Sequence, residues 1–370
     1  MNLDSGTVIL LTAIMCAAAC SLLGTFLVLR RMAMMTDAVS HAILPGLVFG
    51  YWISADSNLV TGTIGATLAA LATVTFVEAL SRSGRVDTSA AMGIVFPAMF
   101  ALGTVLVSRF FTHVHLDADA ILMGNIEFSI FDRLFIGERD LGPRSLWIMG
   151  VLLIVNLLFL LLFYKELKLT TFDPALAAAV GFSPVLIQYA LMTVLSMTTV
   201  GAFTAVGAIL VVALVVVPAA TAYLLTDHLP TMIGLSVLIG AVSAWTGYEL
   251  ALWQDLSVSG AMATMTGVCF LLALLLSPSQ GVIARVRRRQ RNARRFAIDL
   301  MIAHLLTHEA TGAQGAESTI GHTAAALRWS TGEAAATIRR ARDRGLIEQR
   351  ADHLTLTADG RRAAEALALR

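Results

Sequence analysis

The sequence Arg30-Arg31-Met32-Ala33-Met34-Met35-Thr36-Asp37-Ala38-Val39-Ser40-His41-Ala42-Ile43-Leu44-Pro45-Gly46 opens the second of many apolar segments in this chain. Because Asp37 and His41 are four residues apart, a helix places their side chains on one face. A carboxylate and an imidazole on one face of a membrane span favour a divalent-metal site. A polar pair bonded within a helix bundle has the same spacing, so the spacing alone leaves both interpretations open.

Two further features accompany this pair. Pro45 follows His41 by four residues and has no N–H, so the carbonyl of His41 loses its helical partner and could supply an oxygen ligand. Small residues also recur at helical spacing beside the pair, at Ala38, Ala42, Gly46 and Gly50. Such a stripe predicts that the backbone of a neighbouring helix approaches closely.

The sequence of this stretch resembles the second span of permease subunits of ABC transporters for manganese, zinc and iron, the ABC-3 family. The pattern there runs Arg-Arg-x-Ala-x-x-x-Asp-Ala-x-Ser-His-Ala-x-x-Pro-Gly, and every fixed position is present between Arg30 and Gly46. The resemblance implies that Asp37 and His41 coordinate the ion in the translocation path.

Composition indicates a protein that crosses the membrane many times. Of the 370 residues, 57% are hydrophobic and only 14% are charged, and the mean hydropathy is +0.77. These values exclude an ordinary soluble protein. The three cysteines all lie in apolar segments, which argues against a disulfide framework.

Nine segments have the length and apolar character of membrane-spanning helices. They are Val8–Leu29, Met32–Ile53, Asn58–Leu80, Ser89–Arg109, Leu146–Phe163, Pro184–Val200, Gly207–Leu225, Met232–Leu252 and Val258–Leu276. The boundary between the sixth and seventh is the least defined, and Gly201 and Gly207 are the candidate breaks.

Basic residues set the expected orientation in a bacterial cytoplasmic (inner) membrane. Nine crossings place all four basic inter-span segments on one side: Arg30 and Arg31, Arg82 and Arg85, Lys165 and Lys168, and the run from Arg285 to Arg295. The positive-inside rule assigns that side to the cytoplasm. We therefore expect the N-terminus outside and the C-terminus in the cytoplasm.

The segment Phe172–Pro184 predicts a short cytoplasmic helix. Asp173 suits the N-cap, Pro174 the first helical position, and Gly181 the residue just beyond the end. A helix this short is unstable alone and must dock on something. The segment resembles the helix through which these permeases engage their ATPase subunit, although a connector lying on the membrane surface is the alternative. The residues assigned to ATPase coupling are Phe172, Asp173, Pro174, Ala177, Ala178 and Gly181.

The long outer loop contains alternating histidines and aspartates at His113, His115, Asp117 and Asp119, which could pre-bind a cation, although a solvated loop with a helix cap is the favoured interpretation. Its continuation resembles the manganese and iron branch of the family more than the zinc branch.

The predicted fold is an all-α polytopic domain over residues 1–280, a basic linker over 281–295 and a small α+β domain over 296–370. In the last, helices at Phe296–Glu309, Thr319–Trp329 and Ser330–Arg344 precede strands at Leu346–Arg350 and His353–Thr357 and a helix at Ala358–Leu369. This order resembles a winged helix like those of metal-dependent repressors. The basic linker is suited to anionic membrane lipid. Winged helices bind nucleic acid or serve as protein contacts, and attachment to a membrane favours the contact or regulatory role, so we do not expect nucleic acid as a partner.

No Gly-x-x-x-x-Gly-Lys-Ser/Thr sequence occurs, so we expect a transport subunit that is not itself an enzyme and binds no permanent cofactor. By resemblance, the chain imports Mn(II) or Fe(II) in preference to Zn(II), and mixed oxygen and nitrogen ligands do not decide among them. Its expected partners are a cytoplasmic ATP-binding subunit, an extracytoplasmic metal-binding protein and a second permease subunit in a homodimer or heterodimer. The alternative function is a membrane-tethered, metal-responsive transcription regulator.

Overall fold

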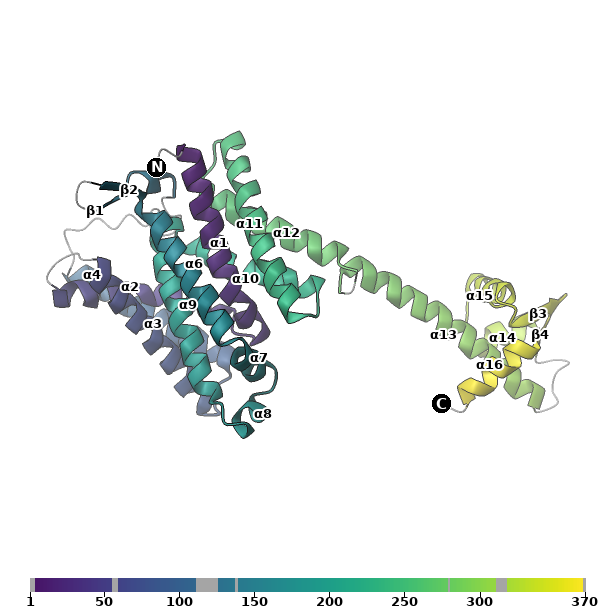
Figure 1. Cartoon of the computed structure of the whole chain (residues 1–370). Coiled ribbons are helices and arrows are strands. Elements are labelled where there is room, and N and C mark those ends of the chain that lie inside the picture. The colour runs from purple at the N-terminus through teal and green to yellow at the C-terminus, as the bar shows by residue number, and fades with distance from the viewer. Residues whose placement is uncertain are drawn as a thin grey trace. The chain divides into compact units, whose positions relative to one another are not determined.

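Long apolar helices build the N-terminal part of the chain, which Figure 1 shows in purple to green. The computed structural model describes residues 4–54, 59–110, 126–136, 139–278, 280–310 and 318–368. The chain divides into two compact units, Met1–Gly281 and Val282–Arg370, and each is described separately.

The first unit contains these helices: α1 (Ser5–Leu29), α2 (Met34–Ser54), α3 (Leu59–Arg82), α4 (Thr88–Phe110), α6 (Arg144–Leu162), α7 (Tyr164–Phe172), α8 (Pro174–Ala179), α9 (Pro184–Val206), α10 (Ala208–Leu225), α11 (Leu229–Gln254) and α12 (Val258–Leu276). A 3-10 helix, η1 (Ile126–Ile130), precedes an antiparallel pair of short strands, β1 (Arg133–Ile136) and β2 (Arg139–Pro143). The side chain of Glu127 in η1 accepts a hydrogen bond of 2.9 Å from the backbone N–H of Val258, at the start of α12.

Eight helices in the described part of the chain are long and apolar enough to cross a membrane, against nine predicted spans. All eight correspond to predicted spans, and the one that falls short is α2. Its first half carries Thr36, Asp37, Ser40 and His41, whose polarity lowers the hydropathy of the helix. The residues that suggest a site are thus the same ones that make α2 a weaker span by composition.

The break between the sixth and seventh predicted spans lies at Gly207. Gly201 lies inside α9, so that helix runs six residues beyond the predicted end at Val200. Gly207 has φ +81°, a backbone conformation that side chains with a Cβ rarely adopt. A glycine with a positive φ therefore separates α9 from α10.

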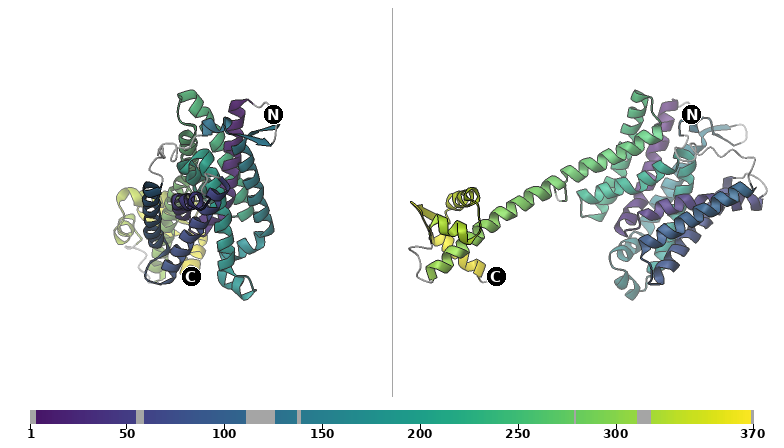
Figure 2. Two further views of the ribbon diagram at one scale, coloured as in Figure 1. Left: turned by 90° about the vertical axis from the view of Figure 1, so that its left-hand side faces the viewer. Right: turned by 180° about the vertical axis from the view of Figure 1, so that it is seen from behind.

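Helix α1 lies at the centre of the first unit, and Figure 2 shows it among the other long helices. Its residues Cys16, Ala17, Leu23 and Phe26 have no exposed surface. Buried side chains also bond to its backbone, because Asn156 donates to the carbonyl of Ala19 at 3.0 Å and Ser236 donates to that of Ser21 at 3.2 Å. These bonds fix α6 and α11 against α1.

Helices α2 and α3 meet backbone to backbone along the predicted stripe of small residues. A Cβ atom on Gly46 would lie 2.4 Å from the carbonyl oxygen of Gly65, and one on Gly50 would lie 2.4 Å from that of Thr61. Ala38 and Ala42 are buried beside them. The predicted close approach is confirmed, and α3 is the helix that approaches.

The second unit contains α13 (Val282–Ala310), α14 (Ile320–Ala326), α15 (Thr331–Asp343), β3 (Ile347–Arg350), β4 (His353–Leu356) and α16 (Ala358–Ala368). The predicted order of helices and strands is confirmed. The basic segment 281–295, which we predicted to be a linker, is instead largely helical and continuous with the next predicted helix, so that both form α13.

Local signals in the second unit act as the sequence indicates. Ser330 and Glu333 form the predicted capping box at the start of α15. β3 and β4 pair antiparallel, with Arg350 opposite His353. Buried residues from α13, α15, α16 and both strands form a core of its own: Ile298, Met301, Ile302, Leu305, Ile338, Ala341, Ile347, Leu354, Leu356 and Ala364.

The contact between α2 and α3 leads to a stability prediction. Gly46→Ala should lower the free energy of unfolding by about 1–3 kcal/mol, because the added methyl group meets backbone atoms that cannot rotate away. Gly234→Ala in α11 is the matched control, since a Cβ there meets no atom within 4 Å. Thermal unfolding of both variants in detergent tests this, and equal melting temperatures would contradict the close contact.

Candidate functional site

Asp37 and His41 lie side by side in the first half of α2. The Nε2 atom of His41 is 3.5 Å from the Oδ1 atom of Asp37. The imidazole also packs against two rings of α4, with ring centroids 4.7 Å from Phe96 and 5.3 Å from Phe100. One oxygen donor and one nitrogen donor are therefore held close together, and aromatic contacts orient the nitrogen donor.

This pair faces an open side of the chain. The side chain of Asp37 is 48% exposed and that of His41 is 27% exposed. Pro45 lies within α2 as predicted, and its ring is close to α4, where a Cβ on Gly103 would lie 2.7 Å from the Cδ atom of Pro45. Since proline has no N–H, the carbonyl of His41 lacks its usual helical donor on the same stretch. Two donors and one carbonyl leave room for ligands from outside the chain.

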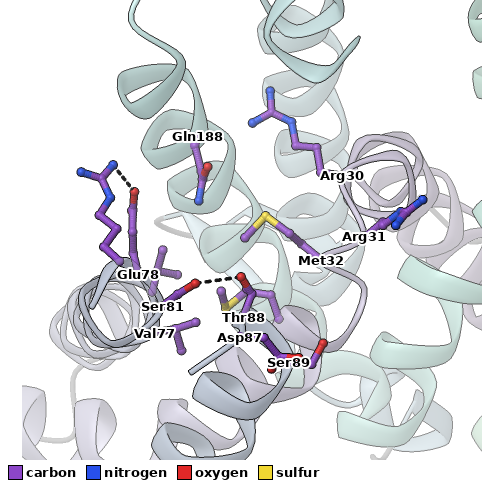
Figure 3. A pocket seen from close by; sticks show the side chains of 13 residues that line it. Arg30, Arg31, Met32, Val77, Glu78, Ser81, Asp87, Thr88, Ser89 and Gln188 are labelled. Carbon is purple, nitrogen blue, oxygen red and sulfur yellow. Dashed lines mark hydrogen bonds and ion pairs between the residues drawn. The ribbon is translucent and has the colours of Figure 1, made fainter. Parts of the chain in front are cut away.

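A cavity of about 450 Å³ lies next to the start of the motif (Figure 3). The motif residues that line it are Arg30, Arg31, Met32 and Met35. On its other walls, Arg82 forms an ion pair with Glu78. Figure 3 also shows a hydrogen bond between Ser81 and Thr88. Both signs of charge are present, so the cavity is polar without being a simple cation site.

Arg30 connects the motif to the helix before α8. Its guanidinium donates to the hydroxyl of Thr170 at 2.7 Å and to that of Thr171 at 3.0 Å, and both threonines belong to α7. Burial lowers the pKa of Arg30 from its ordinary value. From the sequence, Arg30 indicates only the membrane orientation and the family pattern, because its bonding partners lie 140 and 141 residues away in the chain.

Helix α8 has the ends that the sequence predicts. The Oδ1 atom of Asp173 accepts a hydrogen bond of 2.9 Å from the N–H of Leu176, and Pro174 is the first helical residue. At the other end, the N–H of Phe182 donates to Ala177 and that of Gly181 to Ala178, which is the pattern of a Schellman motif. The predicted short helix is confirmed as a structural element.

The residues assigned to ATPase coupling differ in exposure. Ala177 is fully buried, and its side chain packs inside the chain. Ala178 is exposed, and so are apolar side chains around it, namely Phe172, Leu176, Val180 and Phe182. The outer surface of α8 is therefore apolar and contains no charged side chain apart from that of its cap, Asp173. The outer-loop residues His113, His115, Asp117 and Asp119 lie outside the described residues.

These features define a helical membrane protein with an ionisable pair in one helix and a short apolar helix near one end of the bundle. Residues 7–277 match the model of the ABC 3 transport family, and the chain belongs to this family.

Three relatives are informative. The zinc transport system membrane protein TroD of Treponema pallidum is 44% identical over 362 residues, covering 97% of each chain. The manganese transport system membrane protein MntD of Bacillus subtilis is 44% identical over 280 residues, covering 76% of this chain and 95% of its own. The structure of PsaBC from Streptococcus pneumoniae in complex with Fab has a TM-score of 0.63 at 29% identity and covers 75% of this chain and 94% of that chain.

The contact of Arg30 with α7 can be tested by a double-mutant cycle. Arg30→Ala and the pair Thr170→Val with Thr171→Val should show a coupling energy of about 1.5–3 kcal/mol. Either change alone already removes the hydrogen bonds between the guanidinium and the hydroxyls, so combining the two changes should cost less stability than the sum of their separate effects. Denaturant unfolding in mixed micelles provides the measurement. Arg82→Ala, which removes a different arginine, should be additive with the same threonine changes, and additivity for Arg30 as well would contradict the contact.

Proposed function

We propose that the chain is the permease subunit of an ABC importer for divalent Mn, Fe or Zn ions, powered by a separate ATPase. The observation that carries this proposal is the pairing of Asp37 and His41 on an open side of α2, with 3.5 Å between Nε2 and Oδ1. The ion is cargo: it binds to the carboxylate and the imidazole during passage and is then released to the cytoplasm.

The exposure of Asp37 supports a second permease subunit. A half-exposed carboxylate facing lipid would be costly, so this side of α2 must face either a partner or a water-filled path. One chain supplies only one carboxylate, one imidazole and one carbonyl, whereas divalent ions take several ligands. A second subunit, identical or related, would complete the coordination and enclose the path.

Helix α8 is the proposed contact for the ATPase. Its exposed apolar side chains would be unfavourable in water unless something covered them. The bonds from Arg30 to α7 provide a physical connection between this region and the start of the motif. In this scheme, ATPase closure moves α7 and α8, and Arg30 transmits the movement to α2.

The similarity to known proteins does not choose the ion. TroD, named for zinc, and MntD, named for manganese, are each 44% identical to this chain. Asp37 and His41 are a mixed oxygen and nitrogen donor pair that suits Mn(II), Fe(II) and Zn(II) alike. Manganese and iron are the first ions to test, because the sequence of the outer loop resembles the manganese and iron branch of the family.

The proposal also covers the membrane orientation of the chain and the location of the second unit, Val282–Arg370. We infer an inner-membrane location with the N-terminus outside and with the second unit, a winged-helix-like domain, in the cytoplasm. An extracytoplasmic binding protein would deliver the ion. The alternative of a membrane-tethered regulator is disfavoured, because a relative that covers 97% of this chain, tail included, is named for transport.

Removing either the carboxylate or the imidazole should strongly reduce metal uptake. Asp37→Asn or His41→Ala should reduce ATP-dependent metal uptake at least about tenfold at equal protein level, because each removes a direct ligand. Asp255→Asn is the control, since Asp255 is an exposed acidic residue at the end of α11. Uptake of Mn, Fe and Zn by either variant at the rate of the control would refute the site.

A charge on the outer surface of α8 should weaken the contact with the ATPase. Ala178→Glu should reduce copurification of the ATPase and uptake together, because it places a carboxylate among the exposed apolar side chains. Ala293→Glu, at an exposed position of α13, is the matched control. Ala177→Glu is unsuitable, since burial of that carboxylate would unfold the region. Unchanged copurification with Ala178→Glu would leave α8 as a connector.

A further inference from the structure

Three histidines gather in the second unit, away from the proposed transport site. His304 and His308 belong to α13, and His322 belongs to α14. Each residue offers a ring nitrogen, and the three nitrogens lie within 4.8 Å of one another. Their ring centroids are 4.4 Å apart for His304 and His308, 5.8 Å for His304 and His322, and 5.5 Å for His308 and His322.

Regular structure positions all three side chains. His304 and His308 are four residues apart and so share one face of α13, beside the buried Met301 and Leu305 of the domain core. His322 occupies the first turn of α14, where its backbone N–H donates to the hydroxyl of Thr319 at 3.3 Å. The backbone N–H of Ile320 donates to the backbone carbonyl of Asp352 at 2.9 Å, which connects this turn to the hairpin of β3 and β4. Sites held by helices in this way are more precise than sites on loops.

The donor set matches a transition-metal site. Three imidazoles with a fourth position open is a known ligand set of zinc, with Zn–N bonds of about 2.0–2.1 Å. Tetrahedral geometry then requires nitrogens about 3.3 Å apart, which small rotations of half-buried side chains can reach from the present spacing. Manganese prefers oxygen donors, so this cluster should favour zinc, cobalt, nickel or copper over manganese.

Space for a further ligand adjoins the cluster. His308 lines a cavity of about 320 Å³ together with Glu309, Ser318 and His353. Glu309 is already bonded to the guanidinium of Arg361, at 2.8 Å and 3.0 Å. The cavity can thus hold water as a fourth ligand, with polar groups around it.

A histidine cluster can also be a purely structural arrangement of stacked rings. Such an arrangement predicts that the three histidines bind no metal ion at a fixed stoichiometry. We propose instead that His304, His308 and His322 bind one Zn(II)-type ion, which links α13 to α14. This site does not depend on the proposed transport function, because no residue of the first unit takes part in it.

The test uses the full chain in detergent, stripped of metal with a chelator and carrying Asp37→Ala and His41→Ala so that the proposed transport site cannot contribute. Titration with Co(II) should give visible absorption bands of a four-coordinate ion at one equivalent per chain, and micromolar Zn(II) should displace it. Mn(II) should not. The double change His304→Ala with His322→Ala should abolish the bands.

Controls separate binding from folding. His228→Ala, at an exposed position in the first unit, should leave the Co(II) spectrum unchanged. The single change His308→Gln, made in case the double variant does not fold, should weaken Co(II) binding at least about 100-fold at an unchanged apo melting temperature, since even outer-shell partners of a ligand contribute about 10–100-fold. Absence of Co(II) and Zn(II) binding in the parent protein, or equal binding in the histidine variants, would overturn the proposal.

Discussion

An ionisable carboxylate in a membrane helix is the constraint on which the rest of this structure depends. Asp37 cannot face hydrocarbon without a large cost, yet its side chain is half-exposed in the single chain. The chain satisfies part of the requirement itself, by holding His41 next to Asp37 and packing His41 against Phe96 and Phe100. The remainder must come from outside the chain. The proposed cargo ion, second subunit and aqueous path would each meet part of that need.

Close helix packing is what makes this placement possible. The small residues on α2 let the backbone of α3 approach, and α4 packs against the same helix at Phe96 and Phe100, so α2 is fixed while the side chain of Asp37 stays half-exposed. Arg30 then joins the start of the motif to α7, and α7 leads directly into α8. Two hydrogen bonds, from Arg30 to Thr170 and Thr171, therefore join the segment just before α2 to the helix just before α8.

Local signals made much of this predictable. Asp173, Pro174 and Gly181 begin and end α8 as expected, because caps act within one turn. Ser330 and Glu333 likewise begin α15 as expected.

Non-local facts were not predictable in this way. The choice between Gly201 and Gly207 depends on backbone conformation that packing determines, and the burial of Ala177 depends on which side of α8 meets the bundle. The bonds of Arg30 and the histidine cluster join residues far apart in the chain, and periodicity carries no information about such pairs.

The central claim is that the transported ion passes the side of α2 that carries Asp37 and His41. Its most direct test is the location of the ion in an experimental structure of the assembled transporter soaked with Mn(II), identified by anomalous scattering. The account predicts a manganese peak in coordination distance of the Asp37 carboxylate and the His41 imidazole, with further ligands from the second subunit. A manganese ion bound within the bundle elsewhere, with both side chains unligated, would contradict it.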